Sequence, residues 1–204
     1  MPKEFILCIL AYLMGSIPTG VIISRKFSNI DIQTEGSRNI GATNVARLLG
    51  KRFGTLTLLG DIIKGSIPVV LALWLIGTGN LKTDIWISLV ALFSVVGHMY
   101  SIFLGFRGGK GIATSAGVFL VLSPSAVLVD ILIFLLVLLK WRIVSLGSLC
   151  AALCMPILIA LFTDSKIFIL LAVTIAALIF FRHRENIERL LRGEERRWGT
   201  PKAS

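Results

Sequence analysis

The stretch IATSAGVFLVLSPSAVLVDILIFLLVLL, residues 112–139, decides the fold, because its 28 residues fit either one membrane span or two. A helix that crosses about 30 Å of hydrocarbon needs roughly 17 to 25 apolar residues. The stretch is therefore long for one span and short for two. Pro124 lies near its middle, where a proline can start a helix with Ser123 as the cap.

The rest of the chain is built from long apolar runs. Apolar residues make up 55% of the 204 residues, and they are not spread with the period of a soluble helix or strand. Four further runs can span a bilayer, and a fifth, shorter run can cross if its flanking side chains reach the interface. The long runs are residues 5–24, 53–76, 85–104 and 143–162, and the shorter one is 167–181. These runs predict an all-α integral membrane protein.

The positions of lysine and arginine favour two spans in residues 112–139, because these residues accumulate on cytoplasmic loops. A single span there gives six crossings and places the basic segments 25–52 and 182–204 on opposite sides. Two spans of about 13 residues give seven crossings and place both basic segments, with 105–111, on one side. We therefore predict seven transmembrane helices, an external N-terminus and a cytoplasmic C-terminus. We expect one domain over residues 1–204, with cytoplasmic loops 25–52 and 105–111 and an amphipathic tail 182–204.

The formal net charge of +10 follows from these cytoplasmic segments, so we predict no nucleic-acid partner. Three cysteines lie inside apolar runs, where a thiol behaves as a small hydrophobic group. They predict neither a disulfide nor a metal site.

The segment GSRNIGATNVAR, residues 36–47, is rich in hydrogen-bond donors and contains no acid. Hydroxyl and amide groups can donate, glycines let backbone N–H groups approach a ligand, and arginine forks match phosphate. This composition predicts an anion-binding loop, and a polar loop that only caps a helix is the alternative. The residues concerned are Ser37, Arg38, Asn39, Gly41, Thr43, Asn44 and Arg47.

The segment FLGFRGGKGIAT, residues 103–114, places three glycines around Lys110. A nucleotide P-loop has Gly, four residues, then Gly-Lys-Ser/Thr, between a strand and a helix. Here a leucine stands at the first glycine position, a glycine follows the lysine, and an apolar run comes before. We therefore exclude a nucleoside triphosphate site. Gly108 and Gly109, with Lys110 at the start of a helix, favour a simple phosphate instead.

Charged groups inside the apolar runs need partners. Asp61 and Lys64 lie three residues apart on one helical face and predict an ion pair, either structural or in contact with a ligand. Asp130 is expected to face the bundle interior or a cation on another helix. His98, about three helical turns before the glycine and lysine segment, is either a packed structural residue or a ligand-binding one.

The segment RHRENIERLLRG, residues 182–193, predicts an amphipathic cytoplasmic helix with His183, Asn186 and Leu190 on one face. Such a helix can lie on anionic lipid. His183 and Glu188 do not form a catalytic pair on this helix, because five residues separate them by roughly 140°.

Together these segments resemble the bacterial integral-membrane acyl-phosphate:glycerol-3-phosphate acyltransferase family. The resemblance covers nearly the whole chain. It rests on residues 36–47, DIIKG at 61–65, GHMYSIFLGFRGGKGIAT at 97–114 and residues 182–193, in the family's order and spacing. Any one segment alone is weak, whereas four together are specific.

The resemblance implies a seven-helix, multi-pass enzyme of the bacterial inner membrane with its active site at the cytoplasmic face. Such an enzyme transfers a fatty acyl group from acyl phosphate to the 1-hydroxyl of sn-glycerol 3-phosphate, giving lysophosphatidic acid and phosphate. This is the first acylation of phospholipid biosynthesis. The family needs no metal or organic cofactor, and a soluble enzyme that supplies acyl phosphate is an implied partner.

The resemblance also implies site residues. We expect Asp61 and Lys64 to support the site. We expect no covalent acyl-enzyme, because no Ser, His and acid arrangement is visible, and the base is either a substrate phosphate oxygen or His183. The expected catalytic residues are Ser37, Arg47, Lys110, His183 and Asn186. The expected phosphate-binding residues are Asn39, Gly41, Thr43, Asn44, His98, Gly108 and Gly109.

A membrane transporter of a phosphorylated solute is the alternative function. Transporters usually bind their substrate near the midplane, between repeated halves. No internal repeat is visible in this sequence, and most polar segments gather toward one surface. These two features favour the enzyme.

Overall fold

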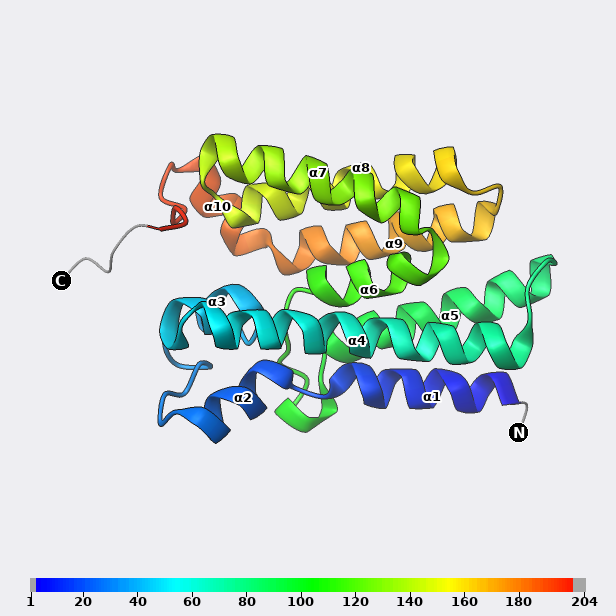
Figure 1. Cartoon of the computed structure of the whole chain (residues 1–204), viewed down its shortest axis with the longest axis horizontal. Coiled ribbons are helices and arrows are strands. Elements are labelled where there is room, and N and C mark those ends of the chain that lie inside the picture. Colours follow the sequence, from blue (N-terminus) through cyan, green and yellow to red (C-terminus); the bar gives the residue numbers. More distant parts are fainter. Residues whose placement is uncertain (1–2, 200–204) are drawn as a thin grey trace. The chain divides into compact units, whose positions relative to one another are not determined.

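The computed structural model describes residues 3–199, and every regular element in this part of the chain is a helix (Figure 1). Residues 1–2 and 200–204 of the expected domain and tail lie outside the described residues. The elements are α1 (Lys3–Ser16), α2 (Thr19–Phe27), α3 (Ala42–Leu49), α4 (Lys51–Ile76), α5 (Leu81–Met99), η1 (Ile102–Leu104), α6 (Ile112–Leu122), α7 (Pro124–Trp141), α8 (Val144–Phe162), α9 (Lys166–Arg182) and α10 (Arg184–Leu191).

The chain forms two compact units, one ending at Leu122 and the other beginning at Ser123. In the first unit α1, α4 and α5 pack side by side, and α6 packs on α4 (Figure 1). A Cβ at Gly65 would lie 2.2 Å from the Thr114 carbonyl oxygen, and one at Gly117 would lie 2.1 Å from the Ile62 carbonyl oxygen. Small residues therefore let α4 and α6 meet backbone to backbone, as is common between membrane helices.

The second unit is formed by α7 to α10 and the segment that follows them. α8 packs against both α7 and α9, and α10 follows α9 after a bend of 62°. The Trp198 N–H donates to the Arg142 carbonyl oxygen at 2.5 Å. The end of the described chain is thus attached to the turn between α7 and α8.

Among the described residues, five helical segments are long and apolar enough to cross a membrane, or six if the bent pair α9 and α10 counts as one span. The five segments are Lys3–Phe27, Lys51–Ile76, Leu81–Leu104, Pro124–Trp141 and Val144–Phe162. The all-helical, membrane-spanning fold predicted from the apolar runs is thereby confirmed.

The predicted break near Pro124 is confirmed, since α6 ends at Leu122 and α7 begins at Pro124 with Ser123 in the cap position. The expected lengths of about 13 residues were wrong, because α6 has 11 residues and α7 has 18. α7 continues through Lys140 and Trp141, with the Lys140 ammonium 4.5 Å from the centre of the Trp141 ring. Such side chains suit the end of a membrane helix, so the apolar run alone underestimated its length.

Two predicted runs are interrupted inside the first unit. The run at residues 5–24 breaks at Ile17 and Pro18, between α1 and α2. In the run at 85–104 the α-helix ends at Met99. The expectation that His98 lies three helical turns before the glycine and lysine segment was therefore wrong. The two breaks are attached to each other, because the Ser101 hydroxyl donates to the Ser16 carbonyl oxygen at 2.6 Å.

Candidate active site

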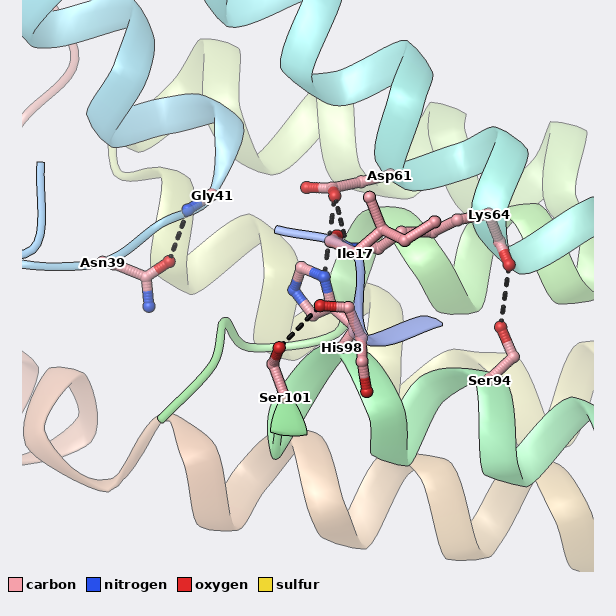
Figure 2. Close-up of polar contacts among 9 residues, drawn as sticks. Ile17, Asn39, Gly41, Asp61, Lys64, Ser94, His98 and Ser101 are labelled. Carbon is pink, nitrogen blue, oxygen red and sulfur yellow. Dashed lines mark hydrogen bonds and ion pairs between the residues drawn. The ribbon is translucent and has the colours of Figure 1, made fainter. Parts of the chain in front are cut away.

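The first feature of the site is the ion pair on α4. Asp61 Oδ1 lies 2.8 Å from Lys64 Nζ, and the two side chains are 3% and 6% exposed. The predicted pairing of these residues is confirmed. Lys64 Nζ also donates to the Ile17 carbonyl oxygen at 2.7 Å (Figure 2). The ammonium is therefore held by a carboxylate and by the break between α1 and α2.

His98 lies on the other side of Asp61. Its Nδ1 is 3.6 Å from Asp61 Oδ1, and the residue is 3% exposed (Figure 2). It comes from the last turn of α5, whereas the carboxylate comes from α4. The carboxylate thus stands between two basic side chains from different helices.

The glycine and lysine segment folds back onto the end of α5. The Gly109 N–H donates to the His98 carbonyl oxygen at 3.0 Å. A Cβ at Gly109 would lie 2.1 Å from His98 Nε2, and one at Gly108 would lie 2.1 Å from the His98 carbonyl oxygen. Glycine is needed at both positions for this close approach. Lys110, half-buried, follows directly and leads into α6.

The segment lies partway along α4 rather than at its end. Asp61 follows the first residue of α4, Lys51, by ten residues, or about 15 Å of helix. Gly109 in the glycine and lysine segment contacts His98, and the His98 side chain lies beside Asp61. It is therefore recessed from the start of α4.

The donor-rich loop at 36–47 is organised by Asn44, which is buried on α3. The Asn44 amide nitrogen donates to the carbonyl oxygens of Ile32 (3.1 Å) and Glu35 (3.2 Å). Its oxygen accepts the Ser37 N–H at 2.9 Å. The side chain of Asn44 thus shapes the loop. Asn39 acts in a similar way, since its Oδ1 accepts the Gly41 N–H at 2.9 Å (Figure 2).

The loop and the glycine and lysine segment meet on one apolar cluster. Leu104 is the last residue of η1 and precedes the glycines of the second segment, and it packs against this cluster. The loop and the residue before Gly105 therefore pack on the same apolar cluster. The cluster consists of Val21, Ile32, Ile40 and Val45.

The predicted side chains of these two segments differ in exposure. Ser37 and Arg38 are exposed, whereas Thr43 and Arg47 are half-buried on α3. Arg38 has a φ of 56°, a left-handed conformation that is uncommon for a residue with a side chain. This part of the loop therefore turns sharply and presents its side chains outward.

His183 and Asn186 lie in the second unit, at the junction of α9 and α10, and both are buried. His183 Nδ1 lies 2.8 Å from the Ile179 carbonyl oxygen. In the neutral ring this contact places the proton on Nδ1 and makes Nε2 the basic nitrogen. The predicted helix over 182–193 was wrong in its bounds, because Arg182 ends α9 and the chain bends at His183 before α10 begins at Arg184. Asn186 lies on α10, whereas His183 lies at its cap position.

Glu195 organises this region and was missed from the sequence. It accepts hydrogen bonds from Ser145 Oγ (2.8 Å), Asn186 Nδ2 (2.6 Å) and Arg189 Nε (2.7 Å). Burial raises the pKa of Glu195, but these hydrogen bonds and the charge of Arg189 outweigh it and hold the pKa below its usual value. The one available signal was an acid within a strongly basic tail.

Asp130 on α7 is half-buried, and its Oδ1 has no hydrogen-bond partner among the described residues. The same part of the chain contains no group of three or more His, Cys, Asp or Glu side chains placed to hold a metal ion.

A family model described as Glycerol-3-phosphate acyltransferase matches residues 5–193. The chain belongs to the glycerol-3-phosphate acyltransferase family. It is 49% identical over 195 residues to the glycerol-3-phosphate acyltransferase of Geotalea daltonii, covering 96% of this chain and 97% of the relative. The protein of the same name from Aquifex aeolicus is 43% identical over 197 residues, covering 96% and 100% of the two chains.

Two crystal structures of PlsY (YgiH), an integral membrane glycerol 3-phosphate acyltransferase, are also similar. The glycerol 3-phosphate form has a TM-score of 0.91 at 41% identity, covering 97% of this chain and 96% of that one. The lysophosphatidic acid form has a TM-score of 0.89 at the same identity and coverage. The chain is therefore an integral membrane acyltransferase of the glycerol-3-phosphate acyltransferase family, as the sequence motifs predicted. The transporter alternative is set aside.

Proposed function

We propose that this acyltransferase transfers a fatty acyl group from acyl phosphate to the 1-hydroxyl of sn-glycerol 3-phosphate. The products are lysophosphatidic acid and inorganic phosphate. The observation that carries the proposal is that the donor-rich loop at 36–47 supplies Ile40 and Val45 to an apolar cluster, and Leu104, shortly before the glycines and Lys110, packs against the same cluster. Donor and acceptor each carry a phosphate, so two adjacent anion sites suit this pair of substrates.

The acceptor phosphate is assigned to Arg47 and Lys110, since a guanidinium and an ammonium supply the charge that a phosphate dianion needs. In the second unit we propose catalytic roles for His183 and Asn186. Both are held in fixed orientations, by the Ile179 carbonyl oxygen and the Glu195 carboxylate respectively.

The donor phosphate is assigned to the hydroxyl and backbone N–H groups of the two segments. Asn39 and Asn44 are proposed to act indirectly, because each holds the loop backbone through its side-chain amide. For His98 we propose a positioning role in place of direct phosphate contact, because Gly109 lies against its Nε2. The groups proposed to contact the donor phosphate are the hydroxyls of Ser37 and Thr43 and the backbone N–H of Gly108. The N–H groups of Gly41 and Gly109 already donate to Asn39 Oδ1 and to the His98 carbonyl oxygen, so for these two glycines we propose a role in shaping the site.

In the proposed reaction the 1-hydroxyl oxygen attacks the acyl carbonyl carbon and forms the new ester bond. The bond from that carbon to the bridging phosphate oxygen breaks, and phosphate leaves with its electron pair. The hydroxyl proton passes to a substrate phosphate oxygen, or to Nε2 of His183. An acyl phosphate is already activated, so positioning and stabilisation of the departing phosphate supply most of the catalysis. No acylated protein residue forms.

We further propose a seven-span topology in the bacterial inner membrane, with α6 as a short seventh span. Support comes from the break at Pro124 and from the basic segments 25–52 and 182–199, which share one side only if the chain crosses seven times. The N-terminus is then external and the active site is cytoplasmic. A soluble enzyme could supply acyl phosphate at that face.

A donor comparison tests the proposal. Purified protein in detergent is given labelled glycerol 3-phosphate with palmitoyl phosphate, palmitoyl-CoA or a palmitoylated carrier protein. We expect labelled lysophosphatidic acid with palmitoyl phosphate alone. Formation of product at a similar rate from the thioesters would refute the assignment of the donor. Acylation is checked by the resistance of the product to periodate, which cleaves only the free vicinal diol of glycerol 3-phosphate. The position of the ester is checked by proton NMR, in which the hydrogens on the acylated carbon shift downfield.

A further inference from the structure

A series of buried polar contacts in the first unit runs from Ile17 through Lys64 and Asp61 to His98 (Figure 2), and the His98 backbone extends it to Gly109. It starts at the Ile17 carbonyl oxygen, which accepts from Lys64 Nζ at 2.7 Å. It continues through Asp61 Oδ1, 2.8 Å from Lys64 Nζ and 3.6 Å from His98 Nδ1. It ends where the His98 carbonyl oxygen accepts the Gly109 N–H at 3.0 Å. We call Asp61, Lys64 and His98 the buried brace.

The buried brace is costly for stability alone. Two opposite charges removed from water recover their desolvation penalty only with good geometry, and an apolar replacement of the same volume is often at least as stable. All three side chains are nevertheless nearly fully buried, at 3%, 6% and 4% exposure for Asp61, Lys64 and His98. Polar groups at these positions therefore point to a requirement for directed contacts rather than for packing alone.

One end of the brace fixes the route to the donor-rich loop. Lys64 holds the Ile17 carbonyl oxygen at the break that separates α1 from α2. α2 leads directly into residues 28–41, and it touches them again where a Cβ at Gly20 would lie 2.1 Å from the Ile40 carbonyl oxygen. The angle at the break thus sets where the loop at 36–47 lies.

The other end fixes the glycine and lysine segment. The imidazole of His98 lies against Gly109, because a Cβ there would be 2.1 Å from Nε2 and 2.8 Å from Cε1. The same residue accepts the Gly109 N–H through its carbonyl oxygen. Lys110 is the next residue, so the placement of its backbone follows from that of His98.

We infer that Asp61, Lys64 and His98 are positioning residues that hold the loop at 36–47 and the segment at 108–111 in register for binding of two phosphates. They act through Ile17 and Gly109 and do not touch substrate. This inference rests on the proposed function for the identity of the ligands, but the coupling between the two segments is a property of the brace itself.

The first test replaces Asp61 with asparagine, which keeps the volume and removes the charge between Lys64 and His98. A misplacement of about 1 Å at a reacting centre can cost roughly 100-fold in rate, so we expect kcat/KM for glycerol 3-phosphate to fall about 100-fold. A raised KM should contribute at least tenfold of this loss. Asp130→Asn is the matched control, since it makes the same change in a membrane helix outside the brace, and it should change kcat/KM less than threefold.

The second test uses the contact between His98 and Gly109. Gly109 is outside the positive φ region, so its backbone accepts alanine, and the imidazole is what a methyl group would meet. We expect Gly109→Ala to cost about 100-fold in the wild-type background and less than threefold in a His98→Ala background. A residue that served folding alone would give independent losses, so multiplicative effects of the two changes would overturn the inference.

Equilibrium binding of labelled glycerol 3-phosphate, measured without any acyl donor, separates this inference from the proposed function. If the wild type binds glycerol 3-phosphate but turns over no acyl phosphate, the donor assignment fails and the brace is judged by binding alone. Asp61→Asn should weaken binding at least tenfold. Wild-type affinity in monodisperse Asp61→Asn protein would overturn the inference. If that variant does not fold, the result for the Gly109 and His98 pair decides.

Discussion

Replacing Glu195 with alanine should release the C-terminal segment from the second unit. The Glu195 carboxylate accepts hydrogen bonds from Ser145 on α8 and from Asn186 and Arg189 on α10, at 2.6 to 2.8 Å. Its side chain is 10% exposed. It therefore links this segment to two helices of the unit, α8 and α10, in addition to the backbone bond of Trp198.

The size of the effect follows from the partners that lose their acceptor. Ser145 and Asn186 are 7% and 6% exposed. A hydrogen bond to a charged group is worth about 1.5–3 kcal/mol, so these two bonds together contribute about 3–6 kcal/mol. Arg189 is 39% exposed on its side chain and can be rehydrated, so its bond adds little. The conformational entropy gained on release is the same in wild type and variant and cancels in the comparison, so we take the lower bound, about 3 kcal/mol, as the expected change.

A change of about 3 kcal/mol corresponds to roughly a 100-fold increase in the open population, at 1.4 kcal/mol per tenfold. Amide hydrogen exchange over residues 184–198 in detergent measures this opening directly, since the Trp198 N–H is bonded to the Arg142 carbonyl oxygen in the closed form. Glu188→Ala is the matched control. Its ion pair with Arg192 is 63% exposed on both sides, and exchange should change less than threefold. Equal exchange in the Glu195 and Glu188 variants would refute the reasoning.

Four further predictions follow from the same structure. The pKa of Glu195 is lowered in the folded protein, so its stabilising effect is present at pH above the ordinary glutamate pKa and is lost as pH falls through the lowered pKa. Hydrogen exchange of the tail should therefore accelerate on acidification, and Glu195→Gln should abolish this pH dependence. Lys110→Ala should reduce acyltransferase activity at least 100-fold, whereas Lys51→Ala, an exposed charge at the start of α4, should leave it within twofold, both assayed at equal protein content. Gly65→Ala places a methyl group 2.2 Å from a backbone carbonyl oxygen of α6 and should cost about 1–3 kcal/mol, seen as a lower melting temperature in detergent; an unchanged melting temperature would show that α4 and α6 are not so closely packed. A reporter that is active only in the cytoplasm should be silent when fused after Pro124, and activity there would contradict the seven-span topology.

Local chemistry predicted several parts of this fold correctly. Asp61 and Lys64 were paired from their spacing alone, because a helix brings residues three apart onto one face. The break at Pro124 was equally local, since proline favours the first turn of a helix. Such features depend on residues close together in the sequence, and they need no knowledge of how the helices pack.

Features set by contacts between distant residues were not predictable in the same way. The end of α5 at Met99 lies inside an apolar run, and it depends on Tyr100 and Ser101, whose contacts reach α1 about 85 residues earlier. Glu195 was missed because Ser145, one of its partners, is 50 residues away. His98 lies between Asp61 and Gly109 because α4 packs on α5, and this packing could not be predicted from the sequence.

The central claim is direct transfer of the acyl group from acyl phosphate to glycerol 3-phosphate, without an acylated protein. The most direct measurement follows the release of inorganic phosphate from palmitoyl phosphate by purified protein, with and without glycerol 3-phosphate. We predict phosphate release in equal amounts to lysophosphatidic acid, and no release above background when the acceptor is omitted. A burst of phosphate without acceptor, matched by palmitate bound covalently to the protein, would contradict the account.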